Sequence, residues 1–287
     1  MSSQQLLIGC DFSSRPDHRK PIVIARGHLQ GSSTVVLDCL QTLNSLQAFA
    51  HWLVQEPQWL GGFDFPFGLP RELVEKLGWP TTWEACLRHY ATLSRLEIRT
   101  AFAAFCNSRA PGSKFAHRAC DRPAGSSPSM KWVNPPVAYM LHAGVPRLLD
   151  AGVVMPGIHM PMATARGLAG QTACRVALEA YPGLLARELI GTVCYKSDDR
   201  VKQTNERLIA RKDILTGLEA GRTRLGLRVR LTHAQRDTLA NDAKGDSIDA
   251  LLCLVQAAWG QRQHENGVPL FGLPENMDSL EGWIVTA

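Results

Sequence analysis

Short apolar runs rich in β-branched residues alternate with one helical pattern in the first 70 residues. Ser45 is a suitable N-cap for the helical pattern, and Pro57 ends it. Gly31-Ser32-Ser33 separates the second and third runs, which is typical of a hairpin. The order β-β-β-α-β is therefore predicted for this region. Its elements are residues 5–12, 21–28, 34–40, 45–56 and 58–64.

The remaining chain is mainly helical in pattern. Residues 71–165 hold helical stretches around a Pro-, Gly- and Ser-rich piece at 107–136, and we interpret them as a largely helical insertion. A fifth strand is predicted at 172–180. We expect one domain, residues 1–287, with the insertion inside it. The expected helices cover 71–77, 83–105, 137–150, 183–191, 200–219, 232–241 and 246–260.

Carboxylates stand at the ends of the predicted strands. Asp11 ends the first strand, Asp64 ends the fourth and Glu179 lies near the end of the fifth. Ligands of α/β sheets bind beyond the carboxyl ends of the strands. A mixed five-stranded sheet in the order 3-2-1-4-5 would place Asp11 beside Asp64. Asp246 and Asp249 open the last helix and are spaced to face the same way.

Several carboxylates that converge repel one another unless a hard cation lies between them. Oxygen ligands suit Mg²⁺ or Mn²⁺, so the metal-ligand set expected here is Asp11, Asp64, Glu179, Asp246 and Asp249. Each residue also has a structural interpretation. Asp246 could cap the last helix, Asp11 and Asp64 could fix turns, and Glu179 could pair with an arginine.

Charge adds a second theme to this picture. The chain has a formal net charge of +5, and two segments, 95–131 and 196–230, are each strongly basic. In the insertion, Arg109, Arg118 and Lys131 lie among Trp132 and Tyr139, so they could hold phosphates while the aromatic rings stack on bases. The alternative is an ordinary loop that is tied down by an Arg118–Asp121 pair.

Composition limits the setting of the protein. Of 287 residues, 45% are hydrophobic and 20% are charged, which is ordinary for a globular chain. No apolar run is long enough to span a bilayer, and the start lacks the pattern of a secretion signal. The eight cysteines include no CxxC pair, which favours reduced thiols. We therefore expect a cytoplasmic protein without a membrane segment.

The motifs around these acids resemble a family of predicted nucleases with an RNase H-like fold, known as domain-of-unknown-function family 429. The resemblance touches nearly the whole chain, although each motif is short. It implies an RNase H-like core, a metal site at Asp11, Asp64 and the last helix, and a site of the Holliday-junction resolvase type. Its motifs are GCDFSSRP at 9–16, GGFDFPFGLP at 61–70, HRACD at 117–121, SPSMKWVNPPVAYM at 127–140, LEAYPG at 178–183, YK at 195–196 with Arg211 following, GDSIDAL at 245–251 and EGWI at 281–284.

Together these patterns favour a divalent-metal-dependent nuclease or phosphodiester hydrolase that acts on nucleic acid or nucleotides. We expect Asp11, Asp64, Asp246 and Asp249 to be catalytic, and Lys196 and Arg211 to join the basic residues of the insertion in binding substrate. Two alternatives stay open. One is a phosphotransferase of the actin and sugar-kinase type, although no glycine follows Asp11 to grip phosphate. The other is a non-catalytic module that binds nucleic acid.

Overall fold

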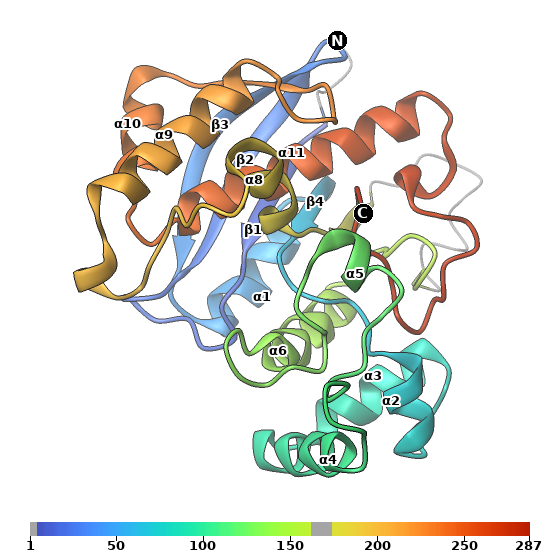
Figure 1. Ribbon diagram of the computed structural model, residues 1–287. Coiled ribbons are helices and arrows are strands. Elements are labelled where there is room, and N and C mark those ends of the chain that lie inside the picture. The colour runs from blue at the N-terminus through green and yellow to red at the C-terminus, as the bar shows by residue number, and fades with distance from the viewer. Residues whose placement is uncertain (1–4, 162–173) are drawn as a thin grey trace.

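The computed structural model describes residues 5–161 and 174–287, so residues 162–165 and 172–173 of the predicted insertion and fifth strand lie outside it. Its centre is a mixed six-stranded sheet in the order β5-β4-β1-β2-β3-β6 (Figure 1). Strands β1, β2 and β3 are antiparallel neighbours, whereas β4, β5 and β6 pair in parallel. The strands are β1 (Leu7–Asp11), β2 (Ile22–Gln30), β3 (Thr34–Leu43), β4 (Trp59–Phe63), β5 (Arg175–Glu179) and β6 (Arg228–Arg230).

The prediction of five strands is corrected by β6. The predicted order 3-2-1-4-5 recurs for the first five strands, and β6 adds to the free edge of β3. Only Val229 of its three residues is buried, between two exposed arginines. A strand this short presents no apolar run, because its pairing with β3 arises from tertiary contact and not from local pattern.

The other regular elements of the described chain are helices. The stretch predicted as one helix at 83–105 is two helices, because the first ends at Thr92 and Ser94 starts the second with a capping box to Glu97. The stretch predicted at 200–219 becomes helical only from Asn205, after a short 3-10 turn at Arg200–Lys202. The α-helices are α1 (Leu46–Gln55), α2 (Arg71–Lys76), α3 (Trp83–Thr92), α4 (Arg95–Asn107), α5 (Asp121–Ala124), α6 (Val137–Asp150), α8 (Pro182–Ile190), α9 (Asn205–Glu219), α10 (His233–Asn241) and α11 (Asp246–Glu265).

The two faces of the sheet carry separate hydrophobic clusters. Side chains of β1 and β2 point alternately to the two faces, as in any strand. Ile8 and Ile24 belong to one cluster, and Leu7 and Val23 to the other. Helix α11 covers the second face with α8, α9 and α10, and it is buried along most of its length. Helices α1 and α6 cover the first face. The sheet is therefore the middle layer of three.

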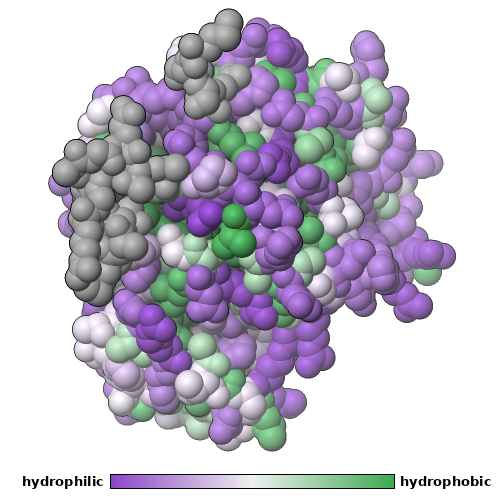
Figure 2. Space-filling model, turned by 180° about the vertical axis from the view of Figure 1, so that it is seen from behind, coloured by the Kyte–Doolittle hydropathy of each residue, from purple (hydrophilic) through white to green (hydrophobic). Residues whose placement is uncertain are grey.

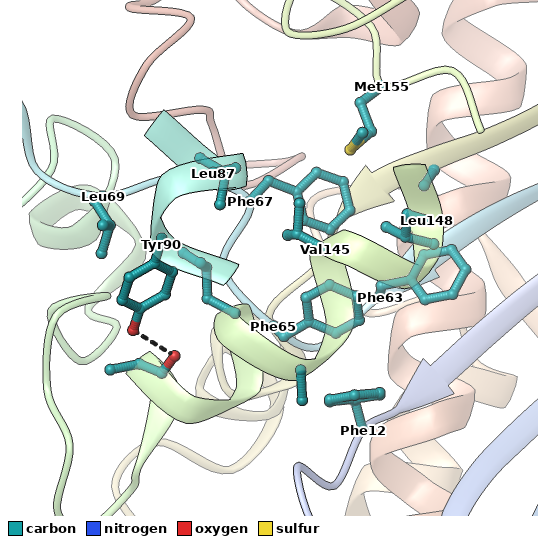
Figure 3. Packing of buried hydrophobic residues seen from close by; sticks show 14 of the residues in the cluster. Phe12, Phe63, Phe65, Phe67, Leu69, Leu87, Tyr90, Val145, Leu148 and Met155 are labelled. Carbon is teal, nitrogen blue, oxygen red and sulfur yellow. Dashed lines mark hydrogen bonds between the residues drawn. The ribbon is translucent and has the colours of Figure 1, made fainter. Parts of the chain in front are cut away.

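The insertion packs on the first face of the sheet through aromatic residues. Phe63, Phe65 and Phe67 follow one another at the end of β4 and join the cluster that also contains Tyr90 of α3 (Figure 3). Tyr90 donates a hydrogen bond to the Ala138 carbonyl at 3.0 Å. Helices α2, α3 and α4 lie at the end of the molecule opposite α9 and α10 (Figure 1). The insertion thus shares a core with the sheet directly beyond Asp64.

Hydrophilic side chains predominate on the surface seen in Figure 2, and the hydrophobic ones there form small separate groups. Among the described helices, none has the length and hydrophobicity that crossing a bilayer would require.

Candidate functional site: a carboxylate cluster beside a cavity

Three aspartates from three separate segments meet at one edge of the sheet. Asp11 ends β1, Asp64 follows β4, and Asp249 lies in the first turn of α11. Strands β1 and β4 are parallel neighbours, and the Asp64 amide donates to the Cys10 carbonyl at 2.9 Å. One carboxylate oxygen of each aspartate lies within 4.8 Å of the other two. The predicted convergence of Asp11, Asp64 and Asp249 is therefore confirmed.

Glycines in the sheet bring the third aspartate to the first two. A Cβ atom on Gly9 would lie 2.0 Å from the Ala250 carbonyl oxygen, and one on Gly62 would lie 2.4 Å from the Cys253 carbonyl oxygen. Neither position tolerates a side chain, so α11 can approach the strands closely only because both are glycine. These glycines fall in the motifs that contain Asp11 and Asp64, and their role was not evident from the sequence.

The negative charge of the three aspartates is poorly compensated by nearby positive charge. Burial raises the pKa of Asp64 to about 7, and the nearby Asp249 contributes to the shift. Burial, with Asp249 and Asp246 nearby, also raises the pKa of Asp11 well above its ordinary value. Asp249 itself is fully buried. Loss of hydration on burial is the larger cause of both pKa shifts, and like charges at short range add to it.

A lysine and a tyrosine hold Asp249 in place. The Tyr195 hydroxyl donates to one carboxylate oxygen of Asp249, and the Lys196 ammonium donates to the other. Burial alone would lower the pKa of Lys196, yet this pKa is raised well above its ordinary value because Asp249 and Asp11 favour the charged form. Lys196 also keeps 43% of its side chain exposed, so it can meet a ligand. The sequence motif included Tyr195 but did not reveal its role.

Arg211, expected to bind substrate, lies behind this pair. It is buried and donates to the carbonyl oxygens of Tyr195 at 2.8 Å and Ala240 at 2.7 Å. These bonds fix the backbone that presents Tyr195 and Lys196. Arg211 is therefore not exposed to substrate, and its contacts position the neighbouring backbone.

Asp246 lies near the cluster but outside the group of three. It is 7% exposed and lies in the first turn of α11, where the helix dipole stabilises a negative charge. Burial raises its pKa to about 6, with Asp242 and Asp249 adding to the shift and Lys20 opposing it.

Glu179 is also outside the group, because an arginine takes both of its oxygens. Arg118 donates to them at 2.8 and 2.6 Å, and the Phe67 amide donates at 2.9 Å. Arg118 also donates to Asp121 at 3.0 Å and is only 2% exposed. Glu179 and Arg118 therefore form the ion pairs that were the alternative interpretation of each residue. Both residues also line the cavity beside Asp64, but the guanidinium nitrogens of Arg118 are engaged in these bonds.

The other two basic residues of the insertion lie apart from the cluster. Arg109 pairs with Glu72 and lies 5.1 Å over the Phe105 ring. Lys131 is half-buried in the segment that precedes α6. Neither lines the cavity that opens beside Asp64.

That cavity has a volume of about 570 Å³. Asp64, Tyr195 and Lys196 line it at the carboxylate cluster, while Met140 of the insertion and Tyr181 after β5 contribute to its walls. The cluster is therefore not sealed in the core, because Asp64 borders a space of small-molecule size. Comparisons of the chain with models of protein families, with curated proteins and with solved structures found no match.

Proposed function

We propose that this protein is a divalent-metal-dependent hydrolase of phosphodiester bonds, with nucleic acid or nucleotides as its substrate. The observation that carries the proposal is the convergence of Asp11, Asp64 and Asp249 from three segments, beside a cavity that Asp64 lines. Such a cluster destabilises the fold in the absence of a cation, because its carboxylates repel one another and raise one another's pKa values. Perturbed groups of this kind are typical of functional sites.

The donor set fits a hard cation. Asp11, Asp64 and Asp249 offer carboxylate oxygens, which are the ligands that Mg²⁺ and Mn²⁺ prefer, and no cysteine or histidine belongs to the group. Asp246 is near enough to influence the pKa of Asp11 and would complete the surroundings of the ion. The ion would supply a deprotonated water for attack and would stabilise charge on the leaving oxygen.

The remaining residues would orient the reactants. Tyr195 and Lys196 fix the two oxygens of Asp249, so its carboxylate keeps one orientation when a ligand enters. The exposed part of Lys196 borders the cavity as well, and its ammonium would attract a substrate phosphate to the cluster.

We propose further that the core is RNase H-like. The support is a sheet with three antiparallel strands, followed by α1 and two parallel strands, in which the acids follow β1 and β4. The resemblance to family 429 belongs to the same proposal. Fold alone does not fix activity, so the carboxylate cluster carries the functional argument.

The test is a cleavage assay with purified protein on single-stranded, double-stranded and branched DNA and RNA. We expect cleavage with Mn²⁺ or Mg²⁺, none with EDTA, and none from Asp64→Asn. The matched control is Asp237→Asn, an exposed aspartate of α10, which should cleave like the wild type. Binding without cleavage by the wild type would favour the non-catalytic module, and turnover of nucleoside triphosphates alone would favour the phosphotransferase.

A further inference from the structure

The cavity beside the carboxylates differs in character from the cluster itself. Its walls away from Asp64 are mostly apolar and come from three parts of the chain: Met140 of α6, Ile190 of α8 and Ile284 near the C-terminal end. Such walls do not bind a phosphate, because an apolar surface offers it no hydrogen-bond donors. The cavity is therefore shaped for a second, less polar part of the ligand.

One aromatic ring in this wall is held in position. The Arg187 guanidinium lies 5.2 Å from the centre of the Tyr181 ring and donates to its hydroxyl at 3.2 Å. Arg187 also donates to the Ala124 carbonyl, so the arginine and the ring are tied to the insertion. A ring fixed in this way can accept a flat heteroaromatic group by stacking at little entropic cost.

The same cavity carries cationic groups. Lys196 lines it beside the carboxylates, and Arg187 lines it beside Tyr181. A volume of about 570 Å³ lies within the usual range of about 300–1,000 Å³ for small-molecule pockets. It therefore matches a single nucleotide unit and not a stacked, paired duplex. An aromatic wall, a cation and a cluster suited to a metal ion together match the base and phosphate of a nucleotide.

We infer that this cavity takes one unpaired nucleobase of the substrate, with the neighbouring phosphate at Asp64 and Lys196. The inference rests on the proposed function and adds its substrate class: a free nucleotide, a single strand, or a base turned out of a duplex. A base in a continuous duplex cannot enter, because its pairing partner and its stacked neighbours occupy the same space.

The test measures binding, so that it does not depend on cleavage. A fluorescein-labelled oligothymidylate and an abasic strand of the same length carry the same phosphates but differ in their bases. With Ca²⁺ as the divalent ion, the wild type should bind the thymidylate about tenfold more tightly or better, since stacking contributes about 1–3 kcal/mol per base. Tyr181→Leu should remove most of this preference, and Tyr181→Phe should keep it.

Tyr139→Leu is the matched control. The sequence suggested that Tyr139 could stack on bases, but in the structure this ring does not line the cavity. Like Tyr181 it has an arginine over its ring, with Arg95 at 4.7 Å. Its variant should keep the preference of the wild type. Equal affinity for the two strands, no binding of either strand, or an unchanged preference in Tyr181→Leu would overturn the inference. Cleavage with Mn²⁺ by a wild type that shows no preference would overturn it and leave the proposed function standing. Tighter binding of the thymidylate than of the abasic strand, without cleavage of any substrate, would leave the inference standing and overturn the proposed function.

Discussion

Two groups of acids, each brought together from separate segments of the chain, differ in how their negative charge is balanced. Arg118 donates four side-chain hydrogen bonds to Asp121 and Glu179 and a fifth to the Glu281 carbonyl, so every guanidinium nitrogen takes part. Asp11, Asp64 and Asp249 share one lysine, which bonds to Asp249 alone. The first group fastens the insertion to the end of β5. The second places Asp64 at the wall of a cavity, with Asp11 and Asp249 next to it.

The comparison teaches that burial of acids is not itself a sign of a functional site. Burial raises the pKa of Glu179, yet Arg118 opposes the shift and supplies hydrogen bonds. At Asp64 the shift to about 7 has less opposition, and it comes partly from another acid. Poorly compensated charge beside a cavity is the feature that points to a ligand.

The largest effect on stability should come from removing the arginine of the balanced group. Arg118→Met would leave two buried carboxylates without their cation, and the free energy of unfolding should fall by about 3–5 kcal/mol. Denaturant titration would measure it. Arg88→Met is the control, because its pair with Glu84 is exposed and should contribute less than about 1 kcal/mol. A loss for Arg118→Met as small as that of the control would refute the structural role of this group.

Removing one acid of the balanced group should have an intermediate effect. Glu179→Gln keeps the shape but takes away the charge that Arg118 meets, and it turns one acceptor into a donor. We expect a loss of about 2 kcal/mol, which is typical of hydrogen bonds to charged groups. Thermal and denaturant unfolding would both report it. If Glu179→Gln were neutral or stabilising, the contrast between the two groups would disappear.

The same isosteric change in the carboxylate cluster should have the opposite sign. Asp11→Asn removes one of several like charges, so the metal-free protein should be unchanged or more stable by about 1 kcal/mol. Cleavage should nevertheless be lost. Unfolding curves in EDTA and cleavage rates in Mn²⁺ would be compared with those of the wild type. Full cleavage by this variant, or outright unfolding, would show instead that Asp11 serves a turn.

The sequence predicted much of this cluster because its signals are local. Asp11 and Asp64 end apolar runs, and Asp249 opens an apolar helix, so strand and helix ends located them. Glu179 ends a strand as well, but its fate depends on Arg118, 61 residues away in a segment without periodicity. No local pattern reveals such a partner. The same holds for β6, whose three residues are a strand only because β3 lies beside them.

The most direct test of the central claim is a Mn²⁺ titration followed by electron paramagnetic resonance, with an oligonucleotide present because substrate phosphates help to complete the ion's coordination. The account predicts saturable Mn²⁺ binding to the wild type and to Glu179→Gln, and binding at least about tenfold weaker in Asp64→Asn. Equal Mn²⁺ affinity in the wild type and Asp64→Asn, or no Mn²⁺ bound to the wild type, would contradict the claim that these carboxylates form a metal site.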